Sequence, residues 1–473
     1  MMRRPDRANP RSDDRVNNFR FDISSSPALS RDLGAGQDRV EIRSDANVSQ
    51  IRLTFTSTEV GNGIPTTTID GGPAVRVQAE SGTSDTLTGP ISRFDDEGIT
   101  FVTRGDATFD VRDTSGVQRG NFFDVVILGT NRADTFNETG STEEYYINGG
   151  MGNDVITGGV NRDFLVGGAG DDTLNGMEGN DSFIGGGGND TIMGGAGDDL
   201  AIMNVGINAT TMMTADGSDS VNLGAGDDMV SLVAPDGGQI RLTFTSAEVG
   251  NASANDATAT GAQDGGLAVR LQLENADGSL TAANVVSRFD DEGTTFTTVG
   301  TATFDVRDLV SGAARGDQFD VVVLGTEGDN VSNFTGRSEA YYVNAGAGND
   351  TITGGLAADF LVGGGGNDTL NGREGNDNFI GGGGNDLITG GAGADLFIFT
   401  ANPGTDTITD FMSGTDKIDL RAFAGVDAAD VTEMTVAGVT TVSVDTDGVA
   451  GAEFTFLLTN GAMPVDSDYM FAA

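Results

Sequence analysis

The sequence predicts an all-β protein in which two parallel β-solenoids alternate with two homologous β-rich domains, as a tandem duplication. Three observations support this fold class. Long segments of the chain occur twice, and each copy contains a glycine- and aspartate-rich array with a nine-residue period. The remainder consists of short alternating or β-branched segments separated by Gly, Asp and Ser clusters, which is typical of strands.

The duplication is visible in long identical segments. Residues 51–57 (IRLTFTS) recur at 240–246, and residues 93–98 (RFDDEG) recur at 288–293. The spacing between the copies drifts from 189 to 196 residues, so we expect an insertion in the second copy, at 251–264. The expected division is an N-terminal arm at 1–32, β-rich domains at 33–128 and 233–324, solenoid arrays at 129–232 and 325–400, and a C-terminal β region at 401–473.

The first β-rich domain is expected to contain five short strands. Its fold is left open between a small sandwich and a continuation of the solenoid. The expected strands are 51–55, 74–78, 99–102, 107–112 and 123–128.

Composition excludes several kinds of chemistry. The chain of 473 residues has no His and no Cys, so it can form no catalytic triad, no thiolate metal site and no disulfide. Its formal charge of -45 disfavours nucleic acid and anionic membranes and favours a cation as partner. No apolar run is long enough to span a bilayer, and the arginines near the start precede no apolar stretch, so we expect no transmembrane segment and no cleaved secretory signal.

Each array divides into six consecutive nonapeptides, beginning with GGMGNDVIT at 149–157. Position six is always Asp and position eight is always apolar. A disordered spacer or a solvated run of charge requires no apolar residue at position eight, so the pattern favours a folded solenoid. The position-six residues are Asp154, Asp163, Asp172, Asp181, Asp190 and Asp199 in the first array and Asp350, Asp359, Asp368, Asp377, Asp386 and Asp395 in the second.

The nonapeptide has a direct physical interpretation. Glycines at positions one, two and four permit a tight turn, and the three residues after the Asp form a short strand with its middle side chain inward. Two nonapeptides make one coil, so alternate repeats stack about 4.8 Å apart. An ion between stacked turns can then be held by Asp carboxylates and turn carbonyls. Oxygen ligands and flexible geometry favour Ca²⁺ over zinc, copper or magnesium.

The stacked carboxylates explain why the metal is needed. At this spacing two of them repel by about 1 kcal/mol in water and by several at an effective dielectric of 20. The array is therefore expected to fold only when divalent cations bind, so that binding free energy becomes folding free energy.

These arrays resemble the RTX (repeats-in-toxin) hemolysin-type calcium-binding β-roll family, whose nonapeptide is GGxGxDxUx. The resemblance implies parallel β-rolls that bind several Ca²⁺ ions through the twelve aspartates above and through turn carbonyls. Some repeats depart from the pattern at Asn161, Ala357, Met177 and Arg373, so their sites are expected to be weaker, to lack a carbonyl ligand or to be empty. The implied carbonyl ligands belong to Gly149, Met151, Gly167, Ala169, Gly185, Gly187, Gly363, Gly365, Gly381 and Gly383.

The C-terminal region is similar to the C-terminal half of serralysin-type secreted proteins, and residues 466–473 are similar to an uncleaved type I secretion signal. This resemblance implies type I secretion machinery as a partner and a secreted, extracellular or cell-surface location. Calcium is scarce inside cells and abundant outside, so the rolls are expected to fold after export. The zinc site of serralysins cannot be present because it requires His.

Two features of the remaining sequence allow alternatives. Asp95, Asp96 and Glu97, repeated at 290–292, fit either a carboxylate pair for glycan cleavage or a surface loop or further calcium site. Tyr145-Tyr146 and the equivalent pair at 341–342 fit either sugar stacking or a cap on the core, and we favour the cap.

The sequence therefore predicts a calcium-binding, structural, adhesive or matrix protein that is not an enzyme, with no catalytic residues and with glycans or cell-surface components as further partners. The alternative is an extracellular, carboxylate-dependent enzyme acting on polysaccharide. A pore-forming toxin is disfavoured because it requires an inserting apolar segment and usually acylated lysines, whereas Lys417 is the only lysine.

Overall fold

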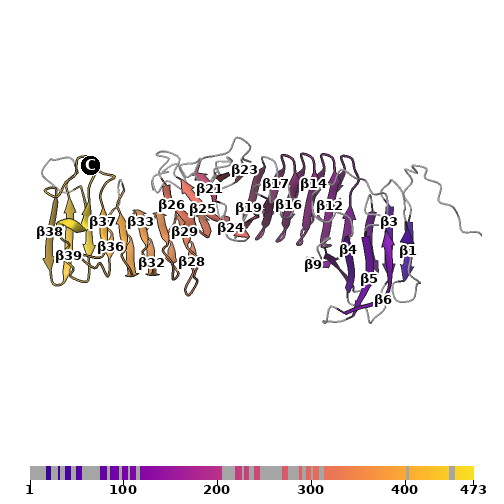
Figure 1. Cartoon of the computed structure of the whole chain (residues 1–473), viewed down its shortest axis with the longest axis horizontal. Coiled ribbons are helices and arrows are strands. Elements are labelled where there is room, and N and C mark those ends of the chain that lie inside the picture. The colour runs from indigo at the N-terminus through magenta and orange to yellow at the C-terminus, as the bar shows by residue number, and fades with distance from the viewer. Residues whose placement is uncertain are drawn as a thin grey trace, which may run out of the picture. The chain divides into compact units, whose positions relative to one another are not determined.

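The computed structural model shows a protein built almost entirely of strands (Figure 1). It forms two compact units, residues 1–228 and 229–473, which are described separately below. None of the described segments is a helix long and apolar enough to cross a membrane. The described residues are 18–22, 30–31, 38–43, 50–55, 75–81, 86–94, 99–104, 107–112, 118–204, 219–225, 228–233, 239–244, 269–274, 287–289, 294–299, 302–307, 314–326, 328–400, 404–446 and 453–472.

The β-rich part of the first unit contains two sheets. In one sheet, three parallel strands are followed by an antiparallel partner: β1 (Asn18–Asp22), β3 (Asp38–Arg43), β7 (Ile99–Arg104) and β10 (Val125–Leu128). The other sheet has the order β2 (Ser30–Arg31), β6 (Thr86–Phe94), β5 (Val75–Ser81), β4 (Gln50–Phe55), β8 (Thr108–Arg112) and β9 (Gln118–Phe123).

The first of these sheets continues into the nonapeptide array without interruption. Strand β10 pairs in parallel with β12 (Tyr145–Met151), and one apolar cluster joins Ile42 and Phe101 to Phe164. The β-rich part is thus a two-layered domain whose core and one sheet extend the solenoid. The two predicted alternatives, a small sandwich and a continuation of the solenoid, therefore each describe part of it. Tyr146 is completely buried between Phe123 and Phe164, which confirms the interpretation of the tyrosine pair as a core cap.

The nonapeptides of the first unit form a parallel β-roll with two sheets. Stacked strands are offset by 18 residues, as in the pairing of Leu165 with Phe183, which confirms two nonapeptides per coil. Every position-eight side chain in both arrays is at most 2% exposed and lies between the sheets. One sheet contains β12, β14 (Phe164–Ala169), β16 (Ser182–Gly187) and β18 (Leu200–Asn204), and the other β11 (Thr135–Asn137), β13 (Val155–Thr157), β15 (Thr173–Glu178), β17 (Thr191–Ala196) and β19 (Ser220–Ala225).

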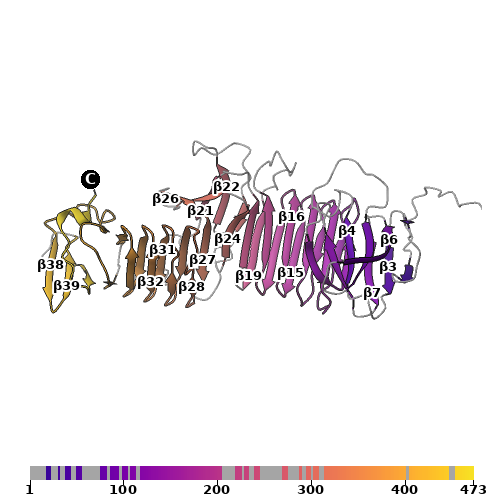
Figure 2. The same ribbon diagram turned by 60° about the horizontal axis from the view of Figure 1, so that its bottom comes forward.

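The second unit repeats these pairings, and Figure 2 shows its strands from another side. Its second array again stacks with an offset of 18 residues. The β-rich strands are β21 (Gln239–Phe244), β22 (Val269–Glu274), β23 (Ser287–Phe289), β24 (Thr294–Val299), β25 (Thr303–Arg307), β26 (Ala314–Phe319) and β27 (Val321–Thr326), and β20 (Asp228–Val233) precedes them. The roll strands are β28 (Val331–Asn333), β29 (Tyr341–Gly346), β30 (Thr351–Thr353), β31 (Phe360–Gly365), β32 (Thr369–Glu374), β33 (Asn378–Gly383), β34 (Leu387–Ala392) and β35 (Leu396–Ile398).

The C-terminal region adds further layers to the second roll. The strands β36 (Thr407–Ile408) and β37 (Lys417–Asp419) stack on β34 and β35, and β40 (Phe454–Leu458) and β41 (Tyr469–Met470) stack on those. The hairpin of β38 (Val431–Val436) and β39 (Val439–Val444) pairs with β40 and covers the end of the apolar core.

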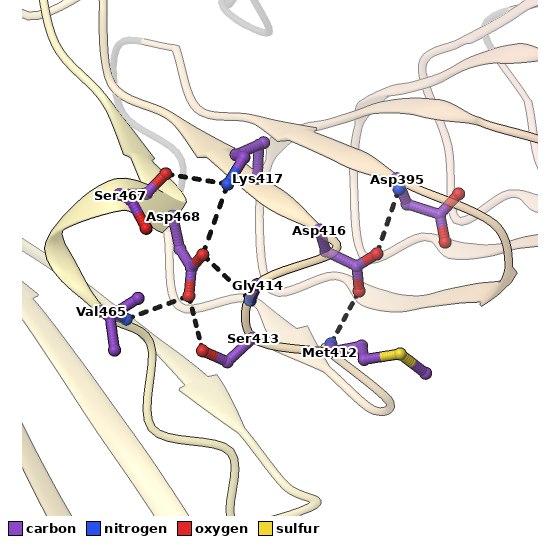
Figure 3. Close-up of polar contacts among 9 residues, drawn as sticks. All are labelled: Asp395, Met412, Ser413, Gly414, Asp416, Lys417, Val465, Ser467 and Asp468. Carbon is purple, nitrogen blue, oxygen red and sulfur yellow. Dashed lines mark hydrogen bonds and ion pairs between the residues drawn. The ribbon is translucent and has the colours of Figure 1, made fainter.

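The last residues of the chain are held against this end of the roll (Figure 3). Asp468 is completely buried in the turn η2 (Asp466–Asp468) and accepts hydrogen bonds from Ser413 Oγ at 2.7 Å and from the backbone N–H of Gly414 at 3.0 Å. The Nζ of Lys417 donates to the Ser467 carbonyl at 2.8 Å. The segment predicted to carry the export signal is therefore folded in this structure, and its role in export stays a prediction.

Candidate calcium-binding ladders

The position-six aspartates form continuous ladders at the turns of both rolls. All are at most 2% exposed. One carboxylate oxygen, Oδ1, accepts a backbone N–H from the preceding coil, in most cases that of another aspartate: Asp154 donates to Asp172 at 2.7 Å, and Asp350 donates to Asp368 at 2.8 Å. Each carboxylate is thereby fixed in orientation between two coils.

The ladders extend past the nonapeptides that were predicted from the sequence. The N–H of Asp190 donates to Asp219 at 2.9 Å, and that of Asp386 donates to Asp406 at 3.0 Å. Residues 216–222 and 224–228 resemble degenerate nonapeptides in the sequence and contain Asp219 and Asp228, whereas Asp406 and Asp416 were not predicted because loops change their spacing to 20 and 21 residues. A local signal was present, since each is followed two residues later by a buried aliphatic side chain. The additional aspartates are Asp219, Asp228, Asp406 and Asp416.

The second carboxylate oxygen, Oδ2, has no hydrogen-bond partner in most of these aspartates although it is buried. Leaving a charged oxygen buried and unpaired is costly, so the arrangement calls for a cation. We call the residues with this property the open aspartates: Asp154, Asp172, Asp181, Asp190, Asp199, Asp350, Asp368, Asp377 and Asp386.

Most open oxygens face a cradle made by a position-one glycine, whereas at Asp350 the position-one residue is Ala345. A Cβ added to Gly167 would overlap Asp172 Oδ2 and would come within 2.5 Å of the Gly185 carbonyl oxygen. The same convergence occurs at Gly149 and Gly363. At these glycines a carboxylate oxygen and a carbonyl oxygen from the next coil thus converge on the space that a Cβ would fill. These are the hard oxygen donors that Ca²⁺ prefers.

The predicted carbonyl ligands occupy two kinds of position. The position-one residues contribute to the cradles, whereas the carbonyls of position three accept hydrogen bonds, such as that from Gly152 N–H to Ala169 at 2.7 Å. A carbonyl has a second lone pair, so this bond leaves room for a metal contact. No three carboxylates converge within the described part of the chain, so a bound ion would take most of its ligands from the backbone.

Asp163 and Asp359 differ from the open aspartates. Their Oδ2 atoms accept the backbone N–H of Gly159 at 2.7 Å and of Gly355 at 2.8 Å. These are the repeats in which Asn161 and Ala357 replace the position-four glycine. In Asp134 and Asp416, at roll ends, Oδ2 likewise accepts the backbone N–H of the residue four positions earlier. We call the four aspartates with this bond the closed aspartates: Asp134, Asp163, Asp359 and Asp416.

Backbone conformation accounts for this difference. The position-two glycines of the regular repeats have positive φ, such as 114° at Gly168, whereas Gly159 and Gly355 lie outside that region. The peptide before Gly159 therefore presents its N–H to the carboxylate. Of the three interpretations of the departing repeats, this geometry favours an empty site at Asp163 and Asp359. By contrast, Met177 keeps a positive φ of 82°, and Asp181 in its repeat remains open.

Burial controls the protonation of the ladder. It raises the pKa of Asp172 to about 8, although the N–H of Asp154 opposes the shift and neighbouring aspartates reinforce it. It raises the pKa of Asp181 to about 8 in the same way, and that of Asp368 to about 7. At Asp163 the N–H groups of Gly159 and Tyr145 oppose burial, and the pKa is raised to about 6. Without a cation the folded ladder thus retains protons near neutral pH.

The acidic segments 95–97 and 290–292 lie outside the described residues, so the proposed glycan-cleaving site there is neither supported nor opposed. The same holds for the expected insertion at 251–264.

A parallel β-roll with regularly spaced, buried oxygen cradles defines a class of calcium-binding repeat protein. The family model for the RTX calcium-binding nonapeptide repeat matches residues 146–165, 166–201, 208–231, 342–370, 362–397 and 371–408. The chain therefore carries two arrays of RTX repeats and binds Ca²⁺ through them.

No curated protein matches the chain. Among solved structures, it is similar to the R3 subunit of a mannuronan C5-epimerase (AlgE6R3) from Azotobacter vinelandii, with 26% identity, a TM-score of 0.24 and coverage of 32% of this chain and 82% of that one. It is also similar to the extracellular lipase LipA from Serratia marcescens, with 18% identity and a TM-score of 0.23, over 70% of this chain but only 40% of the lipase.

Proposed function

We propose that this protein is exported by a type I system, folds on Ca²⁺ outside the cell, and serves a structural or adhesive role at the cell surface or in an extracellular matrix. The observation that carries the proposal is the row of open aspartates beside glycine cradles. RTX repeats imply a secreted protein, which is consistent with this location.

The ladder supports folding that depends on calcium. Closing the rolls without metal buries several carboxylates that interact unfavourably with each other and with their apolar surroundings. Binding of Ca²⁺ supplies the missing partner of each Oδ2, so metal binding and folding occur together. A calcium-poor cytosol would keep the rolls unfolded for export.

A binding role rather than catalysis is part of the proposal. The strongly buried carboxylates of the described residues point into the ladder cradles or form ion pairs, and the chain contains no His or Cys. Such groups are suited to holding cations and fixing structure.

The test is calcium titration of the metal-free full chain, followed by far-UV circular dichroism. We expect a disordered-to-β transition near about millimolar Ca²⁺, the range of extracellular calcium modules. The double variant Asp172→Asn with Asp368→Asn should shift the midpoint to higher calcium. The matched control Asp198→Asn changes an exposed aspartate next to the ladder and should leave the midpoint unchanged.

The surface role is tested separately by measuring association of the protein with cells of its source, with and without chelator. Association that requires calcium supports the proposal. A metal-free chain that is already fully β-structured would contradict calcium-dependent folding, and a calcium-folded protein that never associates with cells or matrix would contradict the surface role.

A further inference from the structure

The outward face of one sheet in each unit carries an unusual set of polar residues. In β4, Ile51 and Leu53 are completely buried, and Arg52 and Thr54 alternate with them on the outer side. We call the alternate positions of β4, β5, β6 and β8 the arginine face, with its equivalent on β21, β22, β23 and β25. In the first unit it comprises Gln50, Arg52, Thr54, Arg76, Gln78, Glu80, Arg93, Thr108, Asp110 and Arg112.

The ten positions of the arginine face are identical in the two units, whereas the neighbouring Gln118 of β9, whose Nε2 donates to Asp110 Oδ1 at 3.0 Å, corresponds to Ala314 of β26. The second copy of the face is Gln239, Arg241, Thr243, Arg270, Gln272, Glu274, Arg288, Thr303, Asp305 and Arg307.

The buried positions of the same strands are less well preserved, because Val77 and Ala79 are replaced by Leu271 and Leu273. A strand of the other sheet has also changed, since Arg104 at the end of β7 corresponds to Val299 at the end of β24. Of the face's side chains whose exposure is described in the first unit, only Arg76 is exposed, and substitutions at exposed positions usually alter stability by less than about 0.5 kcal/mol, so this position is free to diverge. An arginine that is kept at this exposed position in both copies, while core positions change, is constrained by something other than packing.

The strand register arranges the arginines in rows. One row crosses four neighbouring strands as Arg93, Arg76, Thr54 and Arg112, and spans about 14 Å at the usual strand spacing. The next row reads Gln78, Arg52, Asp110. Four arginines thus outnumber the two acids of the face in a chain whose net charge is -45.

A buried carboxylate holds part of this face rigid. Asp110 is 1% exposed and accepts hydrogen bonds from Arg52 Nε at 2.9 Å and Arg112 Nε at 2.8 Å. In the second unit Asp305 pairs with Arg307 at 2.6 Å and with Arg241 at 3.4 Å. Guanidinium groups oriented in advance lose less entropy when they bind an anion. This internal pairing explains three of the ten positions and leaves Arg76, which is exposed, without a structural reason for its identity.

The chemistry of the face selects the partner. Arginines bind carboxylate or sulfate groups, and Gln and Thr side chains suit hydroxyl groups. None of the ten positions is aromatic, although single-stranded nucleic acids and neutral sugars are commonly recognised by stacking on aromatic rings. We propose that the arginine face, present once in each unit, is a binding site for an acidic polysaccharide, whose anionic groups pair with the arginine row.

The proposal is tested on the calcium-loaded full chain with polymers that separate the sources of negative charge. The probes are hyaluronan for carboxylate, dextran sulfate for sulfate, neutral dextran, and double-stranded DNA. The test variant is Arg76→Gln with Arg270→Gln, one arginine from each face. The control variant, Arg132→Gln with Arg337→Gln, removes the same charge from exposed roll loops.

We expect binding to at least one anionic polysaccharide, about tenfold weakening in the test variant, and a change of less than about twofold in the control. Circular dichroism with calcium verifies that both variants are folded. If the unmodified chain shows the expected calcium transition but binds no anionic polysaccharide, the proposed function stands and this inference is overturned. Binding to neutral dextran, DNA binding as tight as polysaccharide binding, equal weakening in both variants, or no binding to either anionic polymer would each overturn it.

Discussion

Acidification is expected to replace calcium in folding the metal-free rolls. In the unfolded chain Asp172 titrates near 3.8, whereas burial raises its folded pKa to about 8. A raised pKa means that the folded state binds the proton more tightly. The stability contributed by this group is therefore fully present below about pH 3.8 and is lost as the pH rises through about 8.

The magnitude follows from the same two values. Between them the folded carboxyl is protonated and the unfolded one is ionised, so each pH unit changes the stability by about 1.4 kcal/mol for one such group. At pH 7 the protonation of Asp172 alone reduces the folding stability of the metal-free roll by about 4 kcal/mol. Lowering the pH to 5 restores roughly two to three kcal/mol of this stability. Asp181 and Asp368 shift in the same direction.

The assay is far-UV circular dichroism of metal-stripped protein between pH 5 and 8. We expect β-structure to increase as the pH falls without calcium, whereas in calcium the protons compete with the metal and the same acidification weakens Ca²⁺ binding. A metal-free chain that is equally unfolded at both pH values, or more structured at pH 8, would refute the assignment of the raised pKa values to a buried ladder.

Four further predictions follow from single side chains. Asp172→Asn should reduce the number of bound Ca²⁺ ions measured by calorimetry, whereas Asp163→Asn should leave it unchanged because Gly159 already satisfies that carboxylate; equal losses would contradict the distinction. Gly167→Ala should abolish the same site and destabilise the first roll by about 2 kcal/mol, seen as a higher calcium midpoint, since the new methyl group overlaps the cradle. Met177→Gly should stabilise the calcium-loaded protein by about 1 kcal/mol in thermal unfolding, because φ is 82° there, and a lower melting temperature would show that the side chain matters more than the strain. Asp468→Ala should cost about 3 kcal/mol in denaturant unfolding by leaving buried donors unpaired, and an unchanged midpoint would show that the C-terminal cap is dispensable.

The sequence was sufficient to predict the rolls because their information is local. A nine-residue period determines the turn, the inward side chain and the 18-residue offset without knowledge of any distant partner. The β-rich parts depend on pairings between strands far apart in the chain, such as Ile51 with Phe109, which composition and alternation do not specify. Their division into two layers, one continuous with the roll, could therefore not be predicted.

The ladder shows the same limit on a smaller scale. Asp406 and Asp416 were missed because loops of different length interrupt the period, although the stacking itself continues. The closed state of Asp163 depends on which way one peptide faces, and the sequence shows only that a glycine is missing at position 161.

The closed aspartates stand where columns begin or end. Asp134 and Asp163 are the first carboxylates of the columns at the two edges of the first roll. Asp416 is the last ladder aspartate of one column in the second roll, next to the C-terminal cap. In the column from Asp359 to Asp416 both end carboxylates are thus satisfied by peptide hydrogen bonds, whereas Asp377 in its interior is open. The length of a roll is therefore modular. Inserting eighteen residues between the closed aspartates at the two ends would add one coil and its cradles without changing either terminus.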